Sequence, residues 1–102
     1  MSPHPRHGLD EAFVTPVRFS LMAALRDDAE IDFPTLREVL EAGDSVLSKA
    51  ITHLEKLGYV KTKKGFVGKR PRTWVASTRL GRKAFQQHLA ALRAIAGDYP
   101  EA

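Results

Sequence analysis

The stretch from Asp44 to Ser77, DSVLSKAITHLEKLGYVKTKKGFVGKRPRTWVAS, contains the change of hydrophobic period that decides the fold. Its first part repeats apolar residues at spacings of three and four, at Leu47, Ala50, Ile51, Leu54 and Leu57. This spacing predicts a helix over residues 45–57 with one apolar face. Asp44 is its predicted N-cap and Gly58 its stop.

After Gly58 the period changes to two, and the residues become β-branched and aromatic. This pattern predicts strands over 59–64 and 73–77. Two glycines and a proline predict that residues 65–72 form a long hairpin tip between them. Because a two-stranded hairpin is marginal alone in water, it must pack on helices. Trp74 is therefore predicted to lie in the core, between the hairpin and helix 45–57.

Two further helices are predicted before this stretch. Asp32 is the predicted N-cap of a helix that has proline in its first turn and ends at Gly43. About three residues separate this helix from helix 45–57, so the two form a helix-turn-helix. Thr15 caps an earlier helix, also with proline in its first turn. A short turn over residues 9–13 precedes that helix, and Ile31 adds a brief strand.

A final helix over about residues 78–96 is capped by Ser77 or Thr78. The order of three helices, a hairpin and a last helix is that of a winged helix-turn-helix, an α+β fold that is mainly α-helical. The prediction is one domain over residues 9–96, with a two-stranded β-wing and a long C-terminal dimerisation helix. A flexible leader, residues 1–8, and a tail, residues 97–102, flank it.

The charge of the chain is unevenly distributed. Residues 1–44 hold 4 basic and 9 acidic side chains, whereas residues 45–102 hold 12 basic and 3 acidic ones. Such an asymmetry is typical of a surface that binds a polyanion, although a solvated basic face without a partner is the alternative. The absence of cysteine excludes disulfides and thiolate zinc sites. Since no apolar run approaches the ~20 residues that cross a bilayer, we expect a cytoplasmic protein without membrane contact.

The outer face of helix 45–57 is predicted to enter the major groove of double-stranded DNA, which is about 12 Å wide and accepts an α-helix. With the apolar face held inward, the opposite face presents Ser45, Ser48, Lys49, Thr52, His53 and Lys56. All six side chains can form hydrogen bonds and none is acidic. The alternative is that they are the solvated side of a surface helix.

The hairpin carries six cations without an acidic residue among them. One is Lys61, and those predicted to contact DNA are Lys63, Lys64, Lys69, Arg70 and Arg72. We expect this wing to lie on phosphates or in the minor groove, with Arg70 and Arg72 inserted. A solubilising loop and a membrane-surface patch are the alternatives.

Over residues 9–92 the chain resembles the compact winged-helix regulators related to the MarR and ArsR groups. The most specific pieces are Leu47-Ser48-Lys49, the run 54–60 (LEKLGYV) and the run 64–73 (KGFVGKRPRT). The run 77–81 reads STRLG where the family usually has Leu-Thr-x-x-Gly. Val14 stands where the family often has a histidine, so a sensing role of that histidine cannot be transferred to this chain. The resemblance implies a bacterial or archaeal homodimer, joined through its first and last helices, on a pseudo-palindromic operator.

The residues themselves also favour a homodimer. The apolar side of the last helix extends beyond what three short helices and a hairpin can cover. The predicted interface consists of Leu9, Phe13, Phe85, Leu89, Leu92 and Ile95. A monomer whose last helix folds back over the core is the alternative.

No Ser-His-Asp arrangement, phosphate-binding glycine loop or nucleotide fingerprint is present, so we expect no enzyme activity, no catalytic residue and no cofactor. The four histidines have no clustered ligand partners, so no metal site is expected. The predicted function is sequence-specific binding of double-stranded DNA by a dimeric transcriptional repressor. The alternatives are a protein-interaction module that binds an acidic partner and a sensor with a small-molecule pocket between the first and last helices, its effector unknown.

Overall fold

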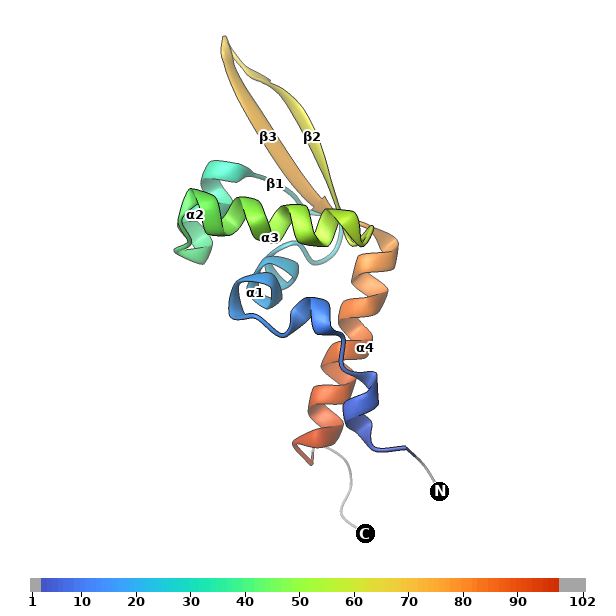
Figure 1. Ribbon diagram of the computed structural model, residues 1–102. Coiled ribbons are helices and arrows are strands. Elements are labelled where there is room, and N and C mark those ends of the chain that lie inside the picture. Colours follow the sequence, from blue (N-terminus) through green and yellow to red (C-terminus); the bar gives the residue numbers. More distant parts are fainter. Residues whose placement is uncertain (1–2, 98–102) are drawn as a thin grey trace.

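The computed structural model describes residues 3–97 (Figure 1). The elements in this range are η1 (Pro5–Gly8), η2 (Glu11–Phe13), α1 (Pro16–Ala24), β1 (Glu30–Asp32), α2 (Phe33–Leu40), α3 (Asp44–Lys56), β2 (Val60–Val67), β3 (Arg70–Ser77) and α4 (Arg79–Ile95). This order confirms the predicted mainly helical winged helix-turn-helix. Residues 98–102 of the predicted tail lie outside the described residues.

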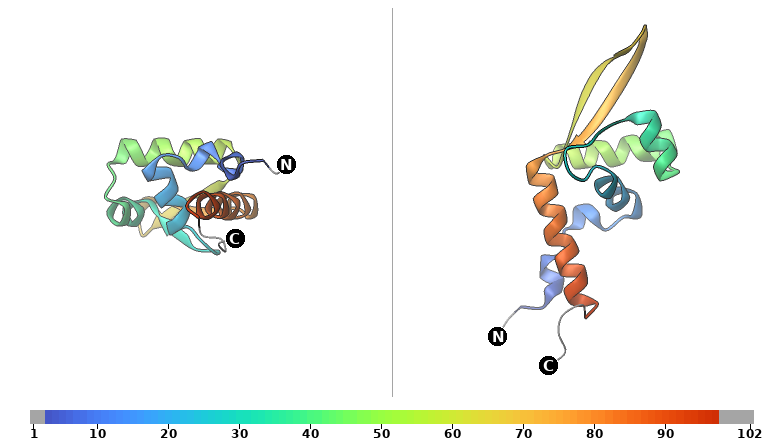
Figure 2. Two further views of the ribbon diagram at one scale, coloured as in Figure 1. Left: turned by 90° about the horizontal axis from the view of Figure 1, so that it is seen from below. Right: turned by 180° about the vertical axis from the view of Figure 1, so that it is seen from behind.

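The molecule is elongated because the wing and α4 extend in opposite directions from a helical body, as both views show (Figures 1 and 2). Its principal extents are 60, 24 and 20 Å. Helices α1, α2 and α3 form the body, and the β2–β3 hairpin rises beside the C-terminal end of α3. In the sheet, β3 lies between β1 and β2 and pairs with both in antiparallel orientation.

One apolar core joins the body to the sheet and to α4. Its fully buried side chains are Phe13, Leu21, Met22, Leu25, Leu36, Leu47, Leu54 and Val75. Helix α3 contributes the predicted stripe except for Leu57, which is exposed at the C-cap. Burying one such side chain stabilises the fold by roughly 1.5–3 kcal/mol, so the core determines which face of α3 remains in solvent.

The starts of α1 and α2 are as predicted. Thr15 Oγ1 accepts a hydrogen bond from the Arg18 N–H at 3.4 Å, and Asp32 Oδ2 accepts one from the Thr35 N–H at 3.3 Å. In both helices a proline occupies one of the first two positions, where no N–H is needed.

The turn between α2 and α3 differs from the prediction at both ends. Helix α2 ends at Leu40 because Glu41 adopts left-handed backbone, with φ of 50°, and not at Gly43. Gly43 is instead the N-cap of α3, while Asp44 is the first helical residue. The Asp44 carboxylate accepts a hydrogen bond from Arg37 Nη1 at 2.7 Å and so ties α3 to α2 instead of capping its own helix.

The wing has longer strands and a shorter tip than predicted. Strands β2 and β3 pair from Val60 with Ser77 to Val67 with Arg70, so most of the predicted tip belongs to the ladder. Only Gly68 and Lys69 form the turn. Gly68 alone of these two has a positive φ, 63°, which is what a type II′ hairpin turn requires.

Trp74 lies across Gly65 and not in the core as predicted. A Cβ at position 65 would stand 2.9 Å from the Trp74 ring, so the glycine makes room for the indole. Because neighbours on a strand point to opposite faces, the core position belongs to Val75, which is fully buried, while Trp74 is half-buried on the other face. The glycine that was interpreted as part of a loop is therefore a strand residue beneath an aromatic ring.

Part of the predicted flexible leader packs against α4. Residues 5–8 form η1, which lies beside the second half of α4 in both views (Figures 1 and 2). A Cβ at Gly8 would be 3.2 Å from the Cβ of Ala91, so the two segments touch closely. His4 caps η1, because its Nδ1 accepts a hydrogen bond from the Arg6 N–H at 3.0 Å.

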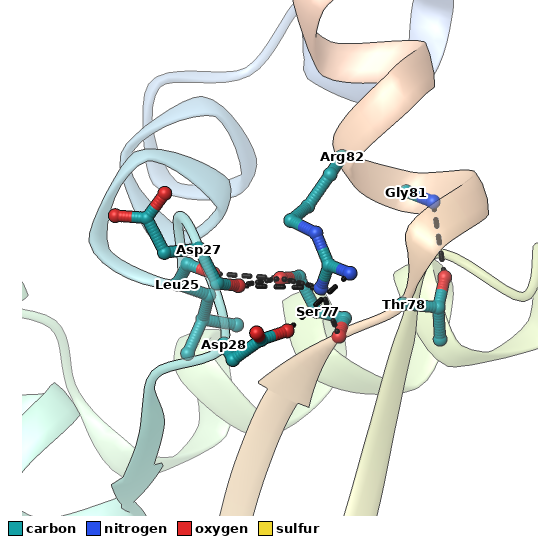
Figure 3. A network of polar contacts seen from close by, with 7 residues as sticks. All are labelled: Leu25, Asp27, Asp28, Ser77, Thr78, Gly81 and Arg82. Carbon is teal, nitrogen blue, oxygen red and sulfur yellow. Dashed lines mark hydrogen bonds and ion pairs between the residues drawn. The ribbon is translucent and has the colours of Figure 1, made fainter.

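A polar network joins the start of α4 to the body (Figure 3). Ser77 Oγ donates a hydrogen bond to the carbonyl oxygen of Leu25 at 2.6 Å. Arg82 Nη1 donates to the carbonyl oxygens of Ser77 and Asp27 at 3.0 and 3.2 Å, and Arg82 also pairs with Asp28 at 3.5 Å. The network fixes the direction in which α4 leaves the body.

Close backbone contact strengthens the same joint. Thr78 Oγ1 accepts a hydrogen bond from the Gly81 N–H at 3.0 Å, which makes Thr78 the cap of α4, and donates one to the Gly58 carbonyl at 2.6 Å. A Cβ at Gly81 would overlap the carbonyl oxygen of Tyr59. Only glycine therefore allows the first turn of α4 to approach the start of the wing.

Candidate nucleic-acid interface

The outer face of α3 presents the predicted polar residues together. All six are exposed: Ser45, Ser48, Lys49, Thr52, His53 and Lys56. The last five line one shallow depression of about 310 Å³. This face combines hydroxyl, imidazole and ammonium groups, which are the groups that read base edges.

The two acidic residues of α3 are both engaged by protein partners. Asp44 pairs with Arg37, and this hydrogen bond raises the pKa of the Arg37 guanidinium above its ordinary value. Glu55 Oε2 accepts a hydrogen bond from Thr62 Oγ1 of β2 at 2.8 Å. These contacts leave the outer face without an unpaired carboxylate and attach the base of the wing to α3.

Val46 is an exposed apolar residue of α3 that the sequence patterns did not single out. It lies three residues before Lys49 and seven before His53, on the same side of the helix, and is 52% exposed. With those residues it lines a hollow of about 450 Å³ between α3 and the start of α1. Its position outside the buried stripe was the signal that could have identified it.

The pairing of the strands divides the wing cations between two faces. Lys61, Lys63, Arg70 and Arg72 lie on the sheet face opposite to that of the buried Val60 and Val75, by the register of β2 and β3. Lys64 lies on the same face as those valines, and Lys69 is in the turn.

Arg72, predicted to insert into the minor groove, has an acidic neighbour within the protein. It is half-buried, and its Nη1 lies 3.8 Å from Asp32 Oδ2. The pKa of Asp32 is lowered, first by the hydrogen bond from Thr35 and to a smaller extent by Arg72. Lys63 is similarly placed 3.8 Å from Glu30, so both cations face acidic residues of β1.

The tip of the wing keeps three cations without an ion pair among residues 3–97. These are Lys64, Lys69 and Arg70. Beside the turn, Phe66 and Val67 are exposed, and a hollow of about 650 Å³ between the wing and Phe33 of α2 is lined in part by Lys64, Phe66 and Arg70. The tip therefore offers charge for phosphates next to apolar surface suited to sugars.

The residues predicted at a dimer interface fall into three groups. Phe13 and Phe85 are only 2% and 6% exposed and contact each other edge to face, with ring centroids 5.1 Å apart. Leu9 and Leu89 are half-buried, whereas Leu92 and Ile95 are 38% and 42% exposed. The two aromatic residues are thus buried in the core of one subunit. The four aliphatic residues keep apolar surface that a second subunit could contact.

A partly buried polar cluster beside these residues was not predicted. His88 Nδ1 accepts a hydrogen bond from the Asp10 N–H at 2.9 Å, and Asp10 Oδ2 accepts one from the Tyr59 hydroxyl at 2.6 Å. The hydrogen bond to Asp10 raises the pKa of Tyr59 to about 12, and burial lowers the pKa of His88. Asp10 and His88 are 78 residues apart, so no local pattern could pair them.

Among residues 3–97, no three or more His, Cys, Asp or Glu side chains are grouped so that they could hold a metal ion. In the same range, every helix is too short or too polar to span a membrane.

The tight turn before an exposed polar helix, followed by a basic hairpin, defines a DNA-binding domain of the winged type. Residues 17–96 match the family of winged helix DNA-binding domains, and the chain belongs to that family. This result confirms the predicted family resemblance. Since the family is one of DNA-binding proteins, it also agrees with the prediction that the chain is not an enzyme.

The chain is similar to other proteins in sequence and in structure. The chain is 32% identical over 77 residues to an uncharacterised protein of Methanocaldococcus jannaschii, covering 76% of this chain and 84% of that protein. It is similar to the transcriptional regulator homologue protein of Pyrococcus horikoshii OT3, with a TM-score of 0.79 and 30% identity over 87% of this chain and 88% of that one. It shares the fold of reduced AbfR bound to DNA, with a TM-score of 0.67 and 21% identity over 95% and 67% of the two chains.

Proposed function

We propose that this protein is a homodimeric, prokaryotic transcriptional repressor that binds one operator sequence in double-stranded DNA in the cytoplasm. The observation that carries the proposal is the exposed, acid-free outer face of α3 with the wing attached beside it through Glu55 and Thr62. The relative from Pyrococcus horikoshii, described as a transcriptional regulator homologue, supports it. The shared fold with AbfR, which was solved on DNA, supports the choice of ligand.

In this proposal α3 lies in the major groove. Lys49 donates to the acceptor pair of a guanine, while the hydroxyls of Ser48 and Thr52 and the imidazole of His53 contact neighbouring base edges or phosphates. Lys64, Lys69 and Arg70 neutralise phosphates beside the adjacent minor groove. Arg72 and Lys63 act differently, since their charges face β1 and hold the wing against the body.

The proposed dimer pairs α4 and the N-terminal segment of one subunit with those of the other. Leu9, Leu89, Leu92 and Ile95 supply the accessible apolar surface for this contact. A two-fold pair would hold two α3 helices about one turn of DNA apart, roughly 34 Å, which requires a pseudo-palindromic site. Repression follows if a bound dimer occupies a promoter.

The test is selection of duplexes from a random-sequence pool by the full chain, followed by gel shift of the enriched operator. A Lys49→Ala/Thr52→Ala variant is expected to lose discrimination among operator sequences, because each lost base contact costs about 1–3 kcal/mol. A Lys69→Ala/Arg70→Ala variant is expected to weaken binding to all sequences and to reduce the slope of log affinity on log salt by roughly 0.9 per lost phosphate.

Lys83→Ala is the matched control, because Lys83 is an exposed cation of α4 away from α3 and the wing. It should leave both the sequence preference and the salt slope close to those of the unchanged protein. Failure to enrich any duplex, or equal binding by all three variants, would contradict the proposal.

A second candidate is regulation of this binding by a small molecule. A hollow of about 450 Å³ lies between the first helix and α4, with Phe13, Phe19 and Leu92 among its apolar walls and His88 and Thr15 among its polar groups. A small neutral aromatic molecule fits this chemistry, because apolar side chains predominate in the lining and no lysine or arginine of residues 3–97 is part of it. Phenol is the first probe: release of bound operator by phenol in the unchanged protein, and not in a Val14→Trp variant that fills the hollow, would support this candidate, whereas equal or no release would oppose it.

A further inference from the structure

Val46 is the apolar member of an otherwise polar surface. Other exposed aliphatic residues, such as Val39 on α2 at 62%, lie outside the outer face of α3. Val46 instead lies in the first turn of α3, beside the side chains of Lys49 and His53. An apolar group left in solvent at the edge of a DNA-reading surface gains stability only when a partner covers it.

The surroundings of Val46 favour a small apolar partner. The apolar lining of this hollow also includes Ala50 and, from the start of α1, Pro16 and Val17, while Thr15 and Arg18 add polar groups. As a β-branched residue in a helix, valine has one strongly preferred rotamer, so its two methyl groups are held in place before binding. The hollow thus presents a rigid aliphatic wall next to the hydrogen-bonding groups of α3.

In the major groove, thymine is the one base that presents a methyl group, at C5. We propose that Val46 contacts the C5 methyl of a thymine and is therefore a specificity-determining residue. This inference rests on the proposed function, because it requires α3 to lie in the major groove. The thymine is next to the base pair that Lys49 contacts, since the two residues are one helical turn apart.

The experiment uses the selected operator with each thymine of one half-site replaced in turn by deoxyuridine, which removes only the methyl group. The unchanged protein is expected to lose affinity about three- to fivefold at one position, the loss expected for one buried methyl. Val46→Ala is expected to bind the thymine operator three- to fivefold more weakly and to bind the thymine and uracil forms equally at that position. Val39→Ala is the matched control and should retain the full preference for thymine.

The outcomes separate this inference from the proposed function. Specific operator binding that is indifferent to every uracil substitution would overturn the role of Val46 and leave the proposed function intact. The same holds if Val46→Ala retains the preference at the affected thymine. If the selection enriches no duplex, the proposed function and the role of Val46 both fail.

Discussion

The two ends of the molecule use their polar side chains in opposite ways. At the α4 end, Asp10, Tyr59 and His88 form hydrogen bonds with one another or with backbone groups. At the wing end, Lys69 and Arg70 are exposed and have no ion pair among residues 3–97. Polar groups that satisfy one another stabilise the subunit, whereas charges without a protein partner are available to a ligand.

Exposed apolar residues occur at both ends. At the wing tip Phe66 and Val67 are 69% and 48% exposed beside cations, whereas on the second half of α4 Leu92 and Ile95 are 38% and 42% exposed and lie three residues apart on one helix. The satisfied polar groups at one end and the exposed cations at the other support the proposed division between self-association and DNA binding. The following changes test that division, from the largest expected effect to the smallest.

Replacing both Leu92 and Ile95 by glutamate should abolish dimerisation. A two-fold interface would bury the exposed part of four such side chains, which are 38% and 42% exposed in one subunit, so the expected loss is about 2.5–5 kcal/mol of association free energy. Sedimentation equilibrium should show a monomer that still unfolds cooperatively. Gln87→Glu, a new charge at an exposed position of the same helix, is the control and should remain dimeric. If the double variant remains a dimer, these two residues of α4 do not form the interface.

Replacing Gly81 by alanine should destabilise the subunit by about 3 kcal/mol, because the new Cβ would overlap the Tyr59 carbonyl and force α4 away from the wing. Urea denaturation measures this loss. Arg79→Ala, at an exposed position in the same turn, should change stability by less than about 0.5 kcal/mol. If the two variants are equally stable, the start of α4 can shift away from Tyr59 without loss of stability, which would contradict this prediction.

The stability of the α4 end should depend on pH through His88. Its pKa in the folded protein is lowered by burial from the ordinary 6.5, so the unfolded chain binds the proton more readily. Stability should therefore fall as the pH drops through 6.5 toward the folded-state pKa, by up to about 1.4 kcal/mol per pH unit. Urea midpoints at pH 7.5 and 5.5 measure the effect.

A His88→Gln variant lacks this titration but can still accept the Asp10 N–H. Its midpoint should change less with pH than that of the unchanged protein over the same interval. The same pH dependence in both proteins would assign the effect to other groups.

The smallest effect is expected at the start of α3. Replacing Gly43 by serine should stabilise the protein by a few tenths of a kcal/mol, because a serine N-cap can accept a hydrogen bond that glycine cannot. Gly43→Ala should instead be less stable than the serine variant by about 1 kcal/mol. Thermal unfolding of the pair measures the difference, and a serine variant less stable than the alanine variant would contradict the cap assignment.

The sequence was sufficient to predict features that depend on neighbouring residues. The stripe from Leu47 to Leu54 set the orientation of α3, and Thr15 and Asp32 marked the starts of two helices. The exposed residues of the candidate site followed directly, because a helix with one face buried has its other face in solvent.

Features that depend on distant partners were not predictable from local patterns. Asp44 looked like a cap but pairs with Arg37, and Gly65 looked like a loop residue but lies under Trp74. The ion pair of Arg72 with Asp32 was not predicted, because Asp32 is supplied by a strand from the first half of the chain. In each case the deciding contact joins segments that the fold brings together.

The hydrogen bonds of Ser77 and Arg82 fix the angle between helix α4 and the helical body. Helix α4 has 17 residues and is therefore about 25 Å long. With the far end of α4 held against a second subunit, a rotation of about 10° at the joint would displace the body by roughly 4 Å, which exceeds the ~3.4 Å rise of one base pair. In the proposed dimer, the separation of the two α3 helices, and hence the length of operator that they would fit, would depend on a few hydrogen bonds within each subunit.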